Sequence, residues 1–262
     1  MQRRHILIAL SAAATGLPIA SQAQVIDLND AINKAGRQRM LSQRMGKAWL
    51  ALVLGVEPVA AQQALDKSMG LFDRQLVELK AFAPNPEIRD TYGKLEAAWS
   101  DYKAALVGTA PGRPGAPGML QADARVLALA HQGTVQYEAA SGKPVGKLVN
   151  VAGRQRMLSQ RMAKFYLAAM LPVDATTASA EITRARTEFL SAMELLRNAP
   201  EATPRIKDEL QLADGQWVFF DAALKKIQSG ASTKPLQDVF VSSENLLSVM
   251  DRVTGLYSAI KV

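Results

Sequence analysis

The sequence predicts an all-α protein made of two tandem up-down-up-down four-helix bundles that pack as a pseudo-symmetric pair. Three observations lead to this prediction. The segment AGRQRMLSQRM occurs twice, at residues 35–45 and 152–162. Apolar residues recur at the helical period on both sides of it, and no alternating strand pattern competes. Glycine- and proline-rich breaks divide each half of the chain into four such stretches.

The repeat extends well beyond the identical segment. Further residues pair at offsets of 117 to 120, among them Asn33 with Asn150, Phe72 with Phe189, Trp99 with Trp217 and Tyr137 with Tyr257. The chain after its first residues is therefore a duplication of a unit of about 119 residues.

The breaks fall where helices are expected to end. They are Gly55 with Pro58, Pro84 with Pro86 and residues 111–118 in the first half, and Pro172, Pro200 with Pro204 and residues 230–235 in the second. Proline cannot continue a helix, and glycine favours its C-terminal end. Four helices per unit are the result.

We expect the first unit over residues 24–140 and the second over 147–262, joined by a short hinge at 141–146. A fourth helix returns the chain to the end where the first helix began. A short link then sets the two motif-bearing helices parallel and side by side. One chain would thereby imitate a symmetric homodimer.

The first 23 residues have the composition of a signal peptide. Arg3 and Arg4 precede an apolar run over 6–20, and a small-x-small cleavage signal follows. Cleavage after Ala23, by the general secretory or the twin-arginine route, predicts a periplasmic protein. The alternative is a retained membrane anchor, but the run is shorter than about 18 residues and contains a glycine and a proline.

Composition excludes several classes of function. The net charge of +7 falls to +5 without the two leader arginines, which favours an anionic partner. Nucleic acid is not expected, since aromatics make up only 6% and no long basic run is interleaved with them. The absence of cysteine removes disulfides, thiolate chemistry and zinc–cysteine sites. No later segment is apolar for long enough to span a bilayer, so a signal would pass through another protein.

Residues 25–54, placed on a helix at about 100° per residue, present three faces. An apolar stripe suited to the unit's own core comprises Leu41, Met45, Ala48 and Leu52. A polar face, expected to be solvated, comprises Asn33, Arg37, Arg44 and Lys47. The third face is an apolar seam that one arginine interrupts, and it comprises Leu28, Ile32, Ala35, Arg39, Ser42, Gly46 and Leu50.

The second unit repeats this seam with Arg156 at its centre, between Ala152 and Ser159. A helix with two apolar stripes needs two packing partners, so we expect the two seams to meet and Arg39 to face Arg156. Two guanidinium groups in a dry seam repel each other and lose hydration. A small planar oxyanion such as nitrate or nitrite would satisfy both. The alternative is that both arginines are structural and pair with Asp or Glu from other helices.

The motif AGRQRMLSQRM, in a helix introduced by DLNDAINK, resembles the signature of the PilJ-type sensor domain, the type IV pili methyl-accepting chemotaxis transducer N-terminal domain. It is also similar to the periplasmic nitrate-sensing segment of NarX-like kinases. The resemblance implies a four-helix extracytoplasmic sensor in which one arginine from each paired helix holds nitrate. By position these are Arg39 and Arg156. The family's usual transmembrane helix and output module have no counterpart here.

Four smaller residues are weaker candidates for the same ligand site. Gly36 and Gly153 precede the arginines and would allow backbone and ligand to approach closely, or would serve helix packing alone. Ser42 and Ser159 follow the arginines on the same face and complete the set of supporting candidates.

No feature of the sequence indicates catalysis or a cofactor. The repeated methionines Met40, Met45, Met157 and Met162 are expected in the core, and so are Trp99 and Trp217. The position of His131 is occupied by Asp251 in the second unit, so no histidine ligand is duplicated. We expect no metal, no haem and no enzyme activity.

Two hypotheses about function follow. The first is a soluble periplasmic protein that binds and senses a small oxyanion and reports to a membrane receptor, sensor kinase or transporter. The alternative is a ligand-free helical interaction module that docks onto a chemoreceptor, pilus or kinase component.

Overall fold

The computed structural model describes residues 24–171, 175–226 and 233–261. These residues form eight α-helices and one short 3-10 helix, and they contain no strand. The prediction of an all-α fold is therefore confirmed. The signal peptide expected over 1–23 and the break at Pro172 lie outside the described residues.

Each half of the chain forms four long helices. The first unit contains α1 (Leu28–Leu54), α2 (Pro58–Phe82), α3 (Pro86–Val107), the 3-10 helix η1 (Arg113–Gly115) and α4 (Ala116–Ser141). The second contains α5 (Pro144–Ala168), α6 (Ala175–Asn198), α7 (Pro204–Leu224) and α8 (Lys234–Ser258). None of the helices in the described ranges is long and apolar enough to cross a bilayer.

The helix ends follow local chemistry. The Asp27 carboxylate caps α1 by accepting a hydrogen bond from the Asp30 N–H at 2.8 Å, and Asn85 caps α3 through the Ile88 N–H at 2.9 Å. Gly55 ends α1 in the left-handed region, with φ of 68°. Prolines open α2, α3, α5 and α7 at positions where the missing N–H is not needed.

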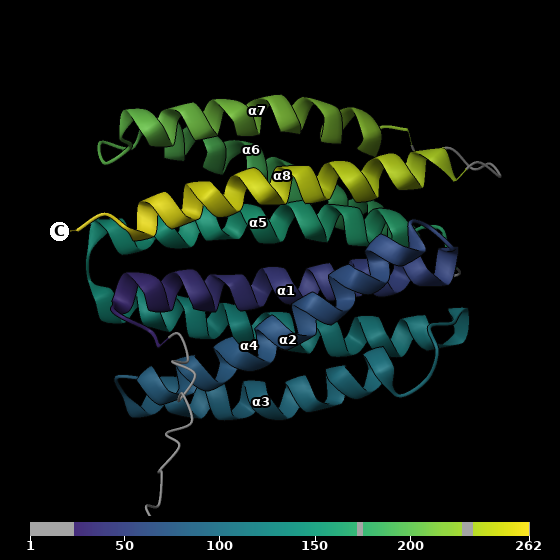
Figure 1. Ribbon diagram of the computed structural model, residues 1–262, viewed down its shortest axis with the longest axis horizontal. Helices are drawn as coiled ribbons and strands as arrows, with labels where there is room; N and C mark the ends of the chain where they lie inside the picture. Colours follow the sequence, from purple (N-terminus) through teal and green to yellow (C-terminus); the bar gives the residue numbers. More distant parts are fainter. Residues whose placement is uncertain (1–23, 172–174, 227–232, 262) are drawn as a thin grey trace, which may run out of the picture.

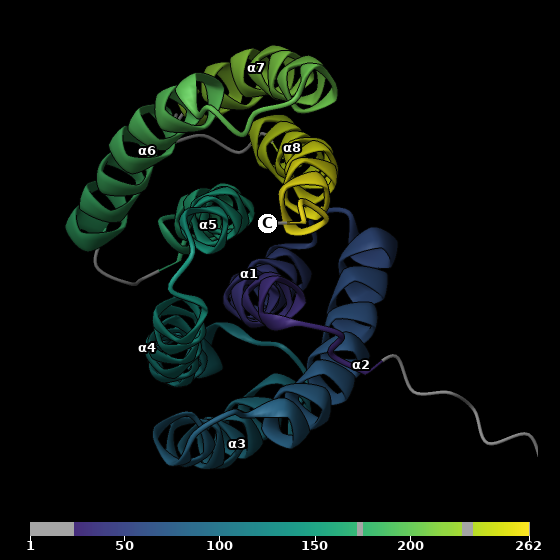
Figure 2. The same ribbon diagram turned by 90° about the vertical axis from the view of Figure 1, so that its left-hand side faces the viewer.

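The two motif-bearing helices α1 and α5 lie side by side at the centre of the molecule (Figures 1 and 2). They run parallel, and they make the most extensive contact of any helix pair. Within each unit the fourth helix packs on the first, so α4 flanks α1 and α8 flanks α5. The helices α2, α3, α6 and α7 form the outer layer in Figure 2. Both units therefore have the same topology around a central seam.

The connection between the units is shorter than the expected hinge. Only Gly142, in the left-handed region with φ of 59°, and Lys143 separate α4 from α5. Residues 144–146 already belong to α5, because Pro144 suits the first turn of a helix. A Cβ added to Gly146 would lie 3.1 Å from the Ile32 Cδ1 atom, so this first turn packs closely on α1.

Aromatic pairs fill the core of each unit in equivalent places. Phe72 packs on Trp99 with ring centroids 4.2 Å apart, and Phe189 packs on Trp217 at 4.5 Å. Both tryptophans are buried, and the four repeated methionines are buried as well. The expectation that these side chains are core residues is confirmed.

Candidate functional site

Two glycines of the central seam, Gly36 and Gly153, lie close to each other across it. A Cβ added to Gly36 would lie 3.9 Å from the Cα of Gly153 on the opposite helix. The same point lies 3.2 Å from Nη2 of Arg39 and 3.6 Å from Nη2 of Arg156. The two guanidinium groups therefore meet beside the glycines, as the seam pattern predicts.

Each arginine reaches across the seam to an asparagine of the other unit. Arg39 donates from Nη2 to the Asn150 side-chain oxygen at 2.7 Å and to its backbone carbonyl at 3.3 Å. Arg156 donates from Nη2 to the Asn33 carbonyl at 3.0 Å. Both arginines are fully buried. Because Asn33 and Asn150 are paired positions of the repeat, the exchange is nearly symmetric.

The two arginines differ in the partner of their Nη1 atoms. Arg156 donates from Nη1 to the Asp251 carboxylate at 2.5 Å, and Asp251 also pairs with Arg37 at 3.0 Å. Arg39 Nη1 instead lies 3.3 Å from Nδ1 of His131, and no carboxylate of the described residues lies within ion-pair distance of Arg39. The structural alternative, an acid for each arginine, thus holds for Arg156 alone.

Burial and neighbouring charges shift the pKa values of these groups. Burial, then the charges of Arg154 and Arg156, lowers the pKa of Arg39 to about 9, so it remains a cation at neutral pH. Burial, then the charges of Arg39 and Arg154, lowers the pKa of His131 to about 4, so its imidazole is neutral and accepts from Arg39. His131 therefore cannot neutralise the arginine.

The pKa of Arg156 depends on a different set of neighbouring charges, which includes a carboxylate. Burial and Arg37 lower the pKa of Arg156 to about 10 although Asp251 opposes them. Burial alone would raise the pKa of Asp251, but the charges of Arg156 and Arg37 outweigh it and lower that pKa to about 2. Asp251 is thus a carboxylate at neutral pH and compensates Arg156.

The two serines of the motif serve the helix backbone. The Ser42 hydroxyl donates to the Arg39 carbonyl and the Ser159 hydroxyl to the Arg156 carbonyl, each at 2.9 Å. Both hydroxyls are buried and receive a hydrogen bond from the following glutamine. They lie next to the arginines along the helix without a hydrogen bond to either guanidinium group.

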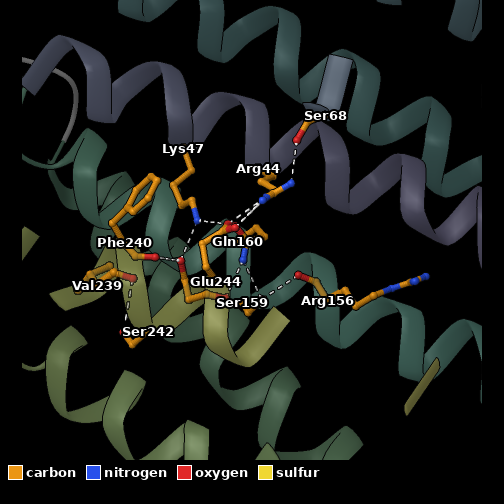
Figure 3. Close-up of polar contacts among 11 residues, drawn as sticks. Arg44, Lys47, Ser68, Arg156, Ser159, Gln160, Val239, Phe240, Ser242 and Glu244 are labelled. Atoms are coloured by element: carbon orange, nitrogen blue, oxygen red, sulfur yellow. Dashed lines mark hydrogen bonds and ion pairs between the residues drawn. The ribbon is translucent and has the colours of Figure 1, made fainter. Parts of the chain in front are cut away.

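The polar face of α1 is not solvated, and that expectation is wrong. Lys47 is fully buried, and Asn33 is nearly so. Helix α8 of the second unit covers this face: Glu244 accepts hydrogen bonds from Arg44 and from Lys47, the latter at 2.7 Å (Figure 3). Helical periodicity separates the faces of one helix, but it does not reveal that a distant helix will supply matching acids.

The repeated lysine makes an equivalent contact in the second unit. Lys164 pairs with the fully buried carboxylate of Asp123 on α4, which also accepts from Gln43 at 2.8 Å. Each unit's first helix therefore carries a buried lysine that pairs with an acid from the other unit's fourth helix. Sequence reasoning missed both acids. The available signal was Asp123, an acid at a core position of an amphipathic helix.

A cavity of about 240 Å³ lies between the units, beside the seam. It is bounded by α4, α5 and α6, and Arg39 of α1 lines its buried end. Four arginines, two glutamates and His131 line it together with apolar side chains. Among the described residues there is no group of three or more His, Asp or Glu side chains arranged to hold a metal ion.

Comparison with known proteins identifies the family. Residues 23–123 and residues 137–253 each match the PilJ family, the type IV pili methyl-accepting chemotaxis transducer N-terminal domain. The chain belongs to the PilJ family. The two matches also confirm that the PilJ unit occurs twice in tandem. No curated protein and no solved structure matches the chain significantly.

Membership of this family gives the chain a general role. PilJ is a sensory and signalling domain of chemotaxis transducers and is not a known catalytic family. Such domains act with signalling partners and are typically periplasmic sensors.

Proposed function

We propose that this tandem PilJ protein is a periplasmic sensor that binds a small oxyanion, nitrate or nitrite, between Arg39 and Arg156. It reports occupancy to a membrane receptor, sensor kinase or transporter. One observation carries the proposal: two fully buried guanidinium groups meet across the seam, and among the described residues a carboxylate forms an ion pair with Arg156 but none does so with Arg39. An uncompensated buried cation is costly, and an anion removes that cost.

The unused hydrogen-bonding capacity of the arginines supports the same ligand. The Nε atoms of Arg39 and Arg156 are buried and have no hydrogen-bond partner among the described residues. A planar oxyanion accepts parallel hydrogen bonds from a guanidinium group. A singly charged ion would balance the charge of Arg39, whereas sulfate would bring a second charge and demand further donors.

The parallel arrangement of α1 and α5 suggests how binding produces a signal. An anion between the arginines removes their repulsion and favours a closer seam. Helix shifts of about 1–2 Å at such interfaces are a common form of signal. The anion must bind the closed seam better than the open one, because equal affinity for both shifts nothing.

A ligand-free interaction module remains the second candidate, favoured by the Arg156–Asp251 ion pair. In this case the protein itself supplies the anion for one arginine, and the seam is purely structural. The outer face of α7 would then be a natural contact surface, because Leu212 and Phe219 lie seven residues apart and are exposed to 56% and 68%.

Calorimetric titration with nitrate, nitrite, sulfate and chloride tests the proposal. The purified protein is compared with Arg39→Ala and Arg156→Ala, and with Arg125→Ala as a control at an exposed arginine. We expect saturable binding of nitrate or nitrite at a single site, lost in both seam variants and kept in the control. No binding of any anion to folded protein would overturn the oxyanion hypothesis and leave the interaction module.

A further inference from the structure

The cavity beside the seam has features that the nitrate hypothesis does not use. Its lining comes from α4 of the first unit, from α5 and α6 of the second unit and from Arg39 of α1. In Figure 2 the helices α4, α5 and α6 lie on the left-hand side of the molecule. Its volume of about 240 Å³ greatly exceeds the roughly 30 Å³ that one water molecule occupies in the liquid. A ligand larger than nitrate can occupy it.

The charged groups of the cavity are only partly compensated. Arg154 pairs with Glu188, and Arg161 pairs with Glu181 at 2.5 Å. Arg39, at the buried end, has no carboxylate partner among the described residues. Arg184 lines the cavity and is exposed, and it forms no ion pair within the described part of the chain. Two guanidinium groups of the lining thus lack an ion pair with a described carboxylate, Arg39 from a fully buried position and Arg184 from an exposed one.

The remaining wall is apolar. It is formed by Ala124, Leu127, Ala128, Met157, Leu158 and Ala185. A ligand that fits this cavity therefore has an apolar body and anionic groups at its ends. Inorganic anions lack the apolar body.

In the second half of the chain, two positions equivalent to residues of the α4 wall of the cavity carry acids that pair with the neighbouring cations. The positions of Ala124 and His131 on α4 correspond to Glu244 and Asp251 on α8. Glu244 pairs with Arg44 and Lys47, and Asp251 pairs with Arg37 and Arg156. The first unit replaces both acids with uncharged side chains, since His131 is neutral. That replacement leaves Arg39 without a carboxylate at ion-pair distance among the described residues, and the charge of Glu138 acts on it only from beyond Asn150.

We propose that the cavity bounded by α4, α5 and α6 is a second binding site, which takes a small organic dicarboxylate. One carboxylate pairs with Arg39 beside His131, the other with Arg184, and the carbon chain lies against Leu127 and Met157. The site goes beyond the proposed function, because its ligand class differs and Arg156 takes no part. It shares Arg39 with the seam, so occupancy of one site affects the other.

The test compares succinate with butyrate, which has the same number of carbons and one carboxylate fewer. Titration of the purified protein is expected to show succinate binding more tightly than butyrate. Arg184→Ala should weaken succinate about two- to fivefold, as for an exposed ion pair, and leave butyrate unchanged. Lys67→Ala is the matched control, because Lys67 occupies the equivalent position in the first unit. It should change neither ligand.

A second substitution gives His131 the identity of its counterpart in the second unit, Asp251. His131→Asp gives Arg39 a carboxylate at the position that Asp251 occupies in the second unit. It should weaken the binding of succinate and of butyrate by more than about tenfold. Arg184→Glu, at an exposed position, provides a charge reversal that does not depend on tolerance of a buried carboxylate. It should abolish the preference for succinate over butyrate.

The outcomes separate this proposal from the seam site. Arg156→Ala should remove nitrate binding and leave succinate binding intact. The hypothesis of a nitrate site and the hypothesis of a dicarboxylate site can therefore be disproved separately. No succinate binding to folded protein would overturn the proposal. Succinate binding that neither His131→Asp nor Arg184→Glu weakens would overturn it as well.

Discussion

His131 and Asp251 occupy equivalent positions in the two units, and only Asp251 gives the buried arginine of its own unit a carboxylate. The two halves share one topology and one central motif, yet their electrostatic environments differ at this point. Replacing each member of the seam separately should therefore have unequal effects.

Arg156→Met should destabilise the protein more than Arg39→Met. Loss of Arg156 leaves the Asp251 carboxylate with Arg37 alone, and we expect a cost of about 1–3 kcal/mol because Asp251 is 44% exposed. Loss of Arg39 breaks hydrogen bonds to Asn150 but no ion pair with a described carboxylate, so it should cost about 1 kcal/mol less than loss of Arg156. Urea unfolding of both variants measures the difference. Equal losses would show that the carboxylate of Asp251 does not compensate Arg156.

Asp123→Asn should be among the most destabilising single substitutions on α4. It leaves the buried ammonium of Lys164 without its acid, at a cost of about 3–5 kcal/mol. Asp101→Asn, at an exposed acid whose ion pair with Arg125 is long at 3.6 Å, is the control and should change stability by less than about 0.5 kcal/mol. Chemical denaturation provides both values. Similar unfolding midpoints for the two variants would contradict the assignment.

Gly133→Ala should destabilise the first unit although alanine favours helices. An added Cβ would lie 2.7 Å from Cε2 of Tyr92, and overpacking of this kind costs about 1–3 kcal/mol. Gly93→Ala is the matched control: it lies on a helix with no atom within 4 Å of its Cβ, and should stabilise by about 0.5–1 kcal/mol. Thermal unfolding distinguishes the two signs. Stabilisation by both would mean that the Tyr92 ring yields easily.

Stability should fall as the pH decreases from about 6.5 to about 4. The pKa of His131 is about 4 in the folded protein, because of burial and of Arg39 and Arg154, against about 6.5 in the unfolded chain. Between these values the unfolded state binds more protons, so acidification favours unfolding. His131→Gln should flatten the dependence over this window. Urea unfolding at several pH values from 7 to 4 tests this.

A second loss of stability should follow at lower pH. The pKa values of Asp251 and Glu244 are about 2 in the folded protein, where burial is outweighed by the cations beside them. Their contribution is complete above the unfolded pKa values near 4 and disappears as the pH falls through about 2. Asp251→Asn should reduce this second loss only. A single transition unaffected by that substitution would contradict the assignment.

The residues that the sequence could identify are those whose signal lies within one helix. The seam, its close approach at Gly36 and Gly153, and the meeting of Arg39 with Arg156 all follow from the helical period and the repeat. Contacts made by α8 and α4 were not predictable in this way. Their positions around the seam depend on how two whole units pack, and periodicity carries no information about that.

The charge environment of the seam does not follow from the sequence pattern. The repeat identifies Asp251 as the counterpart of His131, but it does not predict that Asp251 pairs with Arg156. The contacts of Glu244 were not predictable either, because a polar face such as the one that carries Arg44 and Lys47 is normally solvated. The cavity beside Arg39 could not be predicted at all, since its walls come from helices of both units.

The two-residue connection at Gly142 and Lys143 has a consequence for how such a sensor responds. In a dimer of separate subunits, the fraction of assembled seams depends on how many copies the cell makes. Here the second unit is always present at the high effective concentration that a short covalent tether provides. Assembly of the seam in this protein should therefore be independent of its expression level.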